Sequence, residues 1–171
     1  MDEFTSVLRK GVTSKVNIAL LKLCYVNFSV DTDVQQLLRY YLNAMEKMSD
    51  SFPNLNFVHL TAPLVVNQAT WKAKIKLLTG KGTLWEHQAN IVRNQYNDLL
   101  VQEYRGRKPV FDIAKYESTY ENGKRHMFQD QKKTYSSMIL EYIHDSGHLN
   151  NKERKWVANN LLTFLNGLEF D

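Results

Sequence analysis

Apolar residues in this chain fall into short continuous runs and into longer segments where they recur at helical spacing. The run from Val16 to Leu23 is almost wholly apolar, which predicts a strand buried on both faces, as in a parallel sheet. Residues 55–60 predict a second strand after the break at Pro53, and residues 110–113 predict a short third strand. Strands that alternate with helices are typical of an open α/β sheet with right-handed crossovers.

Helical spacing predicts two long helices between these strands. Thr32 and Gln35 resemble a capping box at the start of the first helix. The apolar positions that follow at helical spacing are Val34, Leu37, Leu38, Tyr41, Leu42, Met45 and Met48. The second long helix is predicted over residues 86–104 and ends before Gly106.

The last third of the chain is predicted to contain a loop and two more helices. Residues 114–130 are polar and are expected to form a loop, with an Asn-Gly turn at 122–123. A stretch around 135–142 is predicted to be helical. The last helix is predicted to start near Asn150, whose side chain can cap it, with Glu153 three residues further on.

The strand count is low for this fold class. Doubly wound sheets usually contain about five strands, whereas the pattern here predicts three. The chain also opens with Phe4, Val7 and Leu8 at helical spacing, like the end of a crossover helix whose preceding strand is missing. We therefore expect one α/β domain over residues 1–171 that lacks its first βα unit, and an uncovered sheet edge able to self-associate. The alternative is a small domain that simply begins with a helix.

Composition agrees with an ordinary globular domain. Of the 171 residues, 43% are hydrophobic and 23% are charged, and the net charge is +4. No apolar run reaches the roughly 20 residues that span a membrane, and no secretion signal is present in the chain. The single cysteine, Cys24, leaves the cellular compartment undetermined. No cofactor is expected.

The lysines of the chain are scattered, so a nucleic-acid partner is not expected. The contrary hypothesis depends on Lys72, Lys74 and Lys76, which lie near Trp71 and Trp85. Salt-sensitive binding to a single strand or a duplex would support it.

The residues with the clearest chemical meaning precede the last helix. Asp145 and His148 are three residues apart across a predicted turn that contains Ser146 and Gly147. In such a turn Asp145 can accept a hydrogen bond from one ring nitrogen of His148 and leave the other nitrogen as a base. The alternative is that the pair only organises the loop. A metal site with His144 is not expected, because the spacing matches no common ligand pattern.

No nucleophile accompanies this pair in the sequence. The chain contains no G-x-S-x-G motif, and the nearest serine to a strand end is Ser29. Cys24 at the end of the first strand is a conceivable thiol nucleophile, although a lone buried cysteine usually only packs. In open α/β sheets ligands bind at the carboxyl ends of the strands. The other candidates there are Tyr25, Asn27, Thr61, Lys115 and Glu117.

Four segments in order resemble the SGNH (GDSL-type) hydrolases. They are Lys22–Asn27 (Lys-Leu-Cys-Tyr-Val-Asn), Phe57–Leu64, Val110–Ala114 with Glu117 and Ser118, and Asp145–Asn150, which resembles the family's D-x-x-H block. The resemblance covers about Val16 to Leu165. It implies a flavodoxin-like three-layer α/β/α sandwich and hydrolysis or transfer of ester-linked acyl groups, from a small ester or an acylated carbohydrate.

The resemblance also assigns roles to individual residues. It implies His148 as the general base and Asp145 as its orienting acid. The family's serine and its glycine oxyanion donor belong to blocks upstream of the first strand here. Val26 stands where the family has an oxyanion-hole asparagine, so Tyr25 or Asn27 would substitute as the donor. Because the nucleophile and that asparagine are missing, the alternative is a binding module that keeps the fold without the catalysis.

Overall fold

The computed structural model describes residues 2–9, 16–67, 85–144 and 148–169. Its elements in chain order are α1 (Asp2–Arg9), β1 (Ile18–Leu21), η2 (Tyr25–Asn27), α2 (Val34–Ser51), β2 (Asn56–Leu60), α4 (Trp85–Tyr104), β3 (Val110–Phe111), α5 (Ile113–Glu117), β4 (Met127–Asp130), β5 (Lys133–Ser136), η3 (Leu140–Tyr142) and α6 (Asn151–Asn166). The chain is thus a mixed α/β protein, as the apolar pattern predicts.

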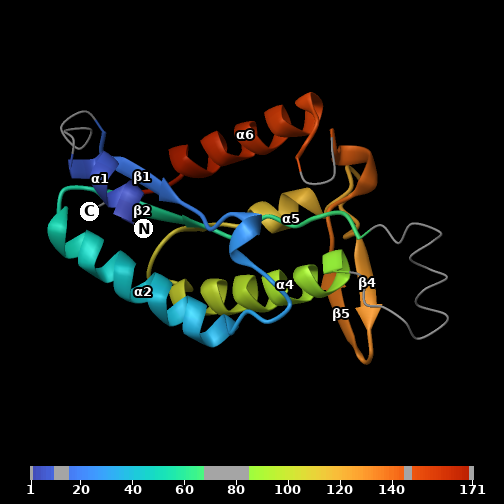
Figure 1. Ribbon diagram of the computed structural model, residues 1–171. Coiled ribbons are helices and arrows are strands. Elements are labelled where there is room, and N and C mark those ends of the chain that lie inside the picture. Colours follow the sequence, from blue (N-terminus) through green and yellow to red (C-terminus); the bar gives the residue numbers. More distant parts are fainter. Residues whose placement is uncertain (1, 10–15, 68–84, 145–147, 170–171) are drawn as a thin grey trace.

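Three parallel strands form the main sheet, in the order β1-β2-β3. Side chains of the central strand alternate between two apolar clusters, because successive residues of a strand point to opposite faces. Phe57 lies in the cluster with α2 and α4, and Val58 lies in the cluster with α6. Helices therefore cover both faces of the sheet, as Figure 1 shows with α6 on one side and α2 and α4 on the other.

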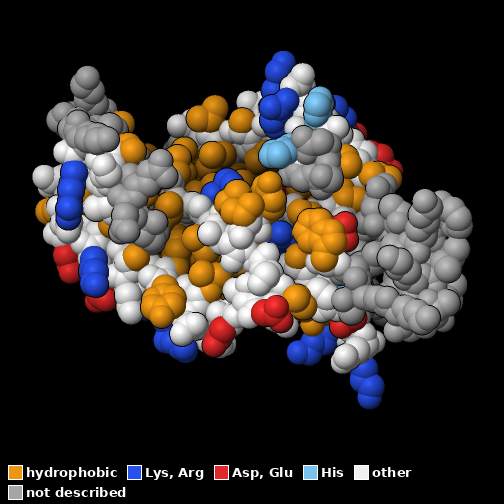
Figure 2. Space-filling model, viewed as in Figure 1, with side chains coloured by type: hydrophobic (Ala, Val, Ile, Leu, Met, Phe, Trp, Pro, Cys, Tyr) orange, Lys and Arg blue, Asp and Glu red, His pale blue; other side chains and the backbone are white. Residues whose placement is uncertain are grey.

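The first strand lies at an edge of this sheet. No other strand in the described part of the chain pairs with the outer edge of β1. Leu20 is 38% exposed, so the prediction of burial on both faces is wrong for β1. Figure 2 shows hydrophobic side chains gathered in the middle of the face along which β1 runs in Figure 1. Val16 and Val26, which flank β1 in the sequence, are also exposed.

The predicted long helices are confirmed, with one cap corrected. The five inward positions of α2 that are fully buried all belong to its predicted apolar stripe. Its N-cap, however, is Asp33, whose side chain accepts a hydrogen bond from the Gln36 N–H at 2.9 Å. Thr32 instead accepts a hydrogen bond from the Ser29 N–H at 2.8 Å, so its hydroxyl is committed to the preceding turn.

The segment between β3 and α6 differs from the prediction. Residues predicted as a loop form α5 and β4, and part of the predicted 135–142 helix is strand β5. The two strands pair as an antiparallel hairpin whose turn places Gln131 at a positive φ of 52°. Asn94 of α4 fixes the end of β5 by bonding both backbone groups of Ser136. This long-range contact overrides the local helical pattern.

Two predicted local signals are confirmed. Gly123 adopts a positive φ of 82° in the Asn-Gly turn, a conformation that glycine reaches without strain. Asn150 is the N-cap of α6, where its side chain accepts a hydrogen bond from the Glu153 N–H at 3.0 Å.

Candidate functional site

The carboxyl ends of the three strands meet the loop before α6. This loop is closed by an antiparallel bridge between Ile143 and Leu149 and by a 2.8 Å hydrogen bond from the His144 N–H to the His148 carbonyl. The ring of His148 then meets the ring of Tyr25 edge-on, with the centroids 6.2 Å apart and an interplanar angle of 87°. Two segments that the sequence singled out separately therefore meet at this edge.

Asp145, Ser146 and Gly147 lie outside the described residues. The hydrogen bond expected between Asp145 and His148 accordingly stays a prediction. His148 itself is exposed, and so is His144.

The turn that carries Tyr25 is held by a hydrogen bond within the turn and by another from Arg93 of α4. The side-chain oxygen of Asn27 accepts a hydrogen bond from the Cys24 N–H at 2.8 Å, which closes the turn on itself. From below, Nη2 of Arg93 donates to the Tyr25 carbonyl oxygen at 3.1 Å. Asn27 thus uses its oxygen for the local turn, while the Tyr25 ring is directed toward His148.

Thr61, at the end of β2, has a structural role. Its hydroxyl donates to Oδ1 of Asp112 at 3.0 Å and accepts from the Ala114 N–H at 3.1 Å. Asp112 in turn caps α5 by accepting from the Lys115 N–H. These bonds join the ends of β2 and β3, and Lys115 itself points to solvent as an exposed residue.

Glu117 is a buried carboxyl group beneath the same edge. It is 4% exposed, and its Oε2 accepts a hydrogen bond from the Leu64 N–H at 2.6 Å. Burial raises the pKa of Glu117 to about 8, although the Leu64 hydrogen bond and the charges of Lys22 and Arg93 act against that rise. The group is therefore mostly protonated at neutral pH.

Arg93, on α4, was not singled out from the sequence. It is 0% exposed, and its guanidinium lies 6.0 Å from the centroid of the Phe28 ring. Burial lowers the pKa of Arg93 to about 10, so the group remains charged at neutral pH. Its Nε and Nη1 have no hydrogen-bond partner among the residues that the structure describes.

Three asparagines on the same helix bind backbone rather than side chains. Asn97 accepts from the Ala62 N–H and donates to the Ala62 carbonyl, and Asn90 does the same for Val65. Each amide thus imitates the edge of a neighbouring strand. Together with Asn94 they fix the segment after β2 and the hairpin. The sequence does contain a signal for these contacts, because the three asparagines recur four and three residues apart and so share one face of the predicted helix.

Five serines in the described part of the chain use their hydroxyl groups in hydrogen bonds within the fold. Ser29 bonds to Thr32, Ser51 to the Lys47 carbonyl, Ser118 to the Ala114 carbonyl, Ser136 to Arg125, and Ser137 to His126. Cys24 is half-buried and lies three residues beyond the end of β1.

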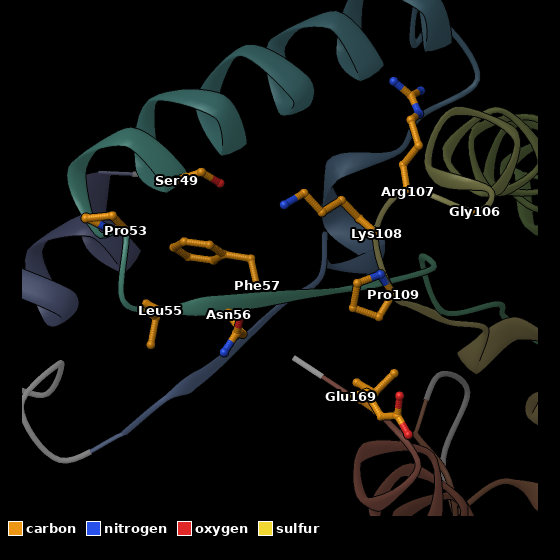
Figure 3. A pocket seen from close by; sticks show the side chains of 11 residues that line it. Ser49, Pro53, Leu55, Asn56, Phe57, Gly106, Arg107, Lys108, Pro109 and Glu169 are labelled. Atoms are coloured by element: carbon orange, nitrogen blue, oxygen red, sulfur yellow. The ribbon is translucent and has the colours of Figure 1, made fainter. Parts of the chain in front are cut away.

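The opposite, amino edge of the sheet contains two hollows. Their volumes are about 530 and 400 Å³, and they share Ser49, Phe57, Arg107 and Lys108. Figure 3 shows Lys108 extending toward Ser49 with the Phe57 ring beneath. Both hollows lie away from the carboxyl edge where the predicted site residues meet.

His59 borders one of these hollows and is a satisfied core histidine, as predicted. A 2.8 Å hydrogen bond joins its Nδ1 to the Tyr41 hydroxyl, and its ring stacks on Tyr104 at 3.9 Å. Burial and then the charge of Lys108 lower the pKa of His59 to about 4. It is therefore neutral at neutral pH.

Searches of protein-family models, curated proteins and solved structures found no match to this chain. In the described ranges no helix is long and apolar enough to cross a membrane, and no three metal-ligating side chains gather together. The lysines considered for nucleic-acid binding, at 72, 74 and 76, lie outside those ranges.

Proposed function

We propose that the carboxyl edge of this sheet is the base half of a serine-type site that hydrolyses acyl esters, either small esters or acylated carbohydrates. His148 acts as the general base, and Asp145 orients it. The observation that carries the proposal is the contact between the rings of Tyr25 and His148. It joins the strand-end motif to the D-x-x-H motif at the edge where α/β sheets bind ligands.

The fold proposed with this function is the flavodoxin-like three-layer sandwich of the SGNH hydrolases. Helices on both faces of a parallel sheet support it. So does the outer edge of β1, whose exposed apolar residues and unpaired backbone suit a further parallel strand.

The nucleophile is proposed to come from such a strand. Neighbouring strands lie about 4.8 Å apart, so a parallel strand beside β1 would end next to Tyr25. A serine at its carboxyl end would then face His148. The hydroxyl of Ser29 is already hydrogen-bonded to Thr32 within its own turn. This favours the added strand over Ser29 as the source of the nucleophile.

Hydrolysis of p-nitrophenyl acetate tests the proposal on the full polypeptide that the gene encodes. His148→Ala is expected to lower kcat/KM by at least about 1,000-fold, because the serine loses its base. Asp145→Asn is expected to lower it by a similar factor. Lys108→Ala, at the amino edge, is the matched control and should leave kcat/KM unchanged. Turnover that survives in His148→Ala would contradict the proposal.

The second candidate is a binding module without catalysis. The buried Arg93, two of whose nitrogens have no partner among the described residues, favours a bound ligand whether or not hydrolysis follows. A full polypeptide that shows no turnover and no labelling by a fluorophosphonate serine probe would favour this candidate.

A further inference from the structure

Arg93 is buried at an energetic cost that the protein does not visibly offset. A guanidinium carries several N–H donors and no acceptor, and unpaired buried donors and charges are strongly unfavourable. Only Nη2 has a hydrogen bond, to the Tyr25 carbonyl, while Nε and Nη1 have none among the described residues. The three asparagines of the same helix, by contrast, have their amide groups bonded. The same helix also leaves the buried hydroxyl of Tyr96 without a partner among the described residues, but Arg93 is the charged group of the two.

The charge of Arg93 is also not neutralised. Glu117 and Cys24 are the groups whose negative forms would stabilise it. Glu117, however, is mostly protonated at neutral pH, since burial raises its pKa to about 8. No ion pair joins Arg93 to an acidic group in the described part of the chain. The region around Arg93 thus holds one net positive charge away from water.

The position of Arg93 links it to the candidate site. Its Nη2 holds the turn of Tyr25, whose ring meets His148. That turn is short and exposed: η2 has only three residues, Val26 is 70% exposed, and one side-chain bond from Asn27 and two backbone bonds close it. Displacing the turn would break these bonds and the one from Nη2, so that every donor of Arg93 could turn to a ligand.

We propose that Arg93 binds a carboxylate of the ligand beneath the Tyr25–Asn27 turn. A carboxylate supplies acceptors for the unused donors of Arg93 and matches its single charge, whereas a phosphate dianion would leave an excess negative charge in the interior. As a statement about substrate, the inference rests on the proposed function: the ester hydrolysed at His148 carries an acidic group. As a statement about binding, it stands without hydrolysis.

Thermal unfolding with sodium acetate as the probe tests the binding. Acetate is compared with acetamide and with sodium chloride at equal ionic strength, near pH 7. When its concentration is about ten times the dissociation constant, acetate is expected to raise Tm by about 3–6 °C. Acetamide and chloride should not. Arg93→Met should fold with a Tm near the wild type and lose the acetate response, while Lys108→Met should keep it.

Several outcomes would overturn the proposal. Equal shifts in acetate and chloride, or an acetate response that persists in Arg93→Met, would show that Arg93 is not the binding residue. A larger shift with inorganic phosphate would contradict the carboxylate assignment. If Arg93→Met does not fold, the Glu117 pKa of the wild type, followed by carboxyl-carbon NMR, decides instead. Acetate bound at Arg93 should raise that pKa, and an unchanged pKa would sink the idea.

His148→Ala separates this inference from the proposed function. It should retain the acetate response while losing hydrolysis. An acetate response in a protein without any hydrolysis would remove the proposed function alone, and hydrolysis without an acetate response would remove only the carboxylate site.

Discussion

Both edges of the sheet border hollows of similar size, but buried polar groups without partners among the described residues lie at the carboxyl edge. Two hollows beside Asp112, of about 590 and 470 Å³, adjoin that edge. At the amino edge, hollows of about 530 and 400 Å³ adjoin His59, which is hydrogen-bonded to Tyr41 and neutral. At the carboxyl edge, Arg93 keeps unused donors and Glu117 keeps a proton at neutral pH. Perturbed and unsatisfied groups cluster at functional sites. The comparison therefore favours the carboxyl edge for the proposed site.

The largest effect expected from a single change concerns the asparagine contacts that shape the carboxyl edge. Asn97→Ala leaves the N–H and the carbonyl of Ala62 buried without partners, so the free energy of unfolding should fall by about 2–4 kcal/mol. Gln95→Ala, on the exposed side of α4, should change it by less than about 0.5 kcal/mol. Urea unfolding of both variants measures the difference. Similar values for the two would mean that Asn97 does not hold the edge.

The next effect separates the two edges by pH. Glu117 has a pKa raised from 4.5 to about 8, so its contribution to stability is complete below pH 4.5 and is lost as pH rises toward 8. His59 has a pKa lowered from 6.5 to about 4, so its contribution is complete above pH 6.5 and is lost as pH falls toward 4. The two slopes oppose each other between pH 4.5 and 6.5. From pH 6.5 to 8 only the Glu117 slope remains, at about −1.4 kcal/mol per pH unit.

Two variants check this assignment through unfolding free energies measured between pH 4 and 8. Glu117→Gln should remove the fall above pH 6.5 relative to the wild type. His59→Gln should instead remove the rise at acidic pH and leave the fall in place. A fall above pH 6.5 that persists in Glu117→Gln would assign it to another group.

The smallest effect concerns the ring contact at the carboxyl edge. Tyr25→Ala removes the aromatic partner of His148, a contact worth about 0.5–1.5 kcal/mol, and should lower kcat/KM by about threefold to tenfold. Tyr25→Phe keeps the ring and should stay near the wild type. Tyr40→Ala removes an exposed tyrosine of α2 and should have no effect. A loss in Tyr40→Ala equal to that in Tyr25→Ala would mean that the ring contact has no special role.

Local sequence signals predicted most of the main fold. The stripe from Val34 to Met48, the cap at Asn150 and the turn at Gly123 depend on residues a few positions apart, so the sequence contains all the information needed. The strands of the main sheet were predicted for the same reason. The hairpin of β4 and β5 was not, because its placement depends on Asn94, which lies far away in the chain.

Part of the candidate site could likewise be predicted from the sequence, and part could not. The convergence of Tyr25 and His148 follows from the rule that parallel strands end at one edge, so it could be predicted. Arg93 could not be predicted, because its importance lies in a carbonyl 68 residues away and in donors that have no hydrogen-bond partner among the described residues. A pattern of polar positions shows that a helix face is unusual, but not which groups remain unsatisfied.

The asparagines of α4 also have a consequence for how the chain folds. Asn90 and Asn97 reach backbone groups only 25 and 35 residues away. Closing loops of that size costs somewhat less entropy than closing the longer loop that brings α6 onto β2. We therefore expect their bonds to form before the contacts of α6, with β2 and α4 as the folding nucleus. Substitutions at Asn97 should then slow refolding more than they accelerate unfolding, whereas substitutions in α6 should do the reverse.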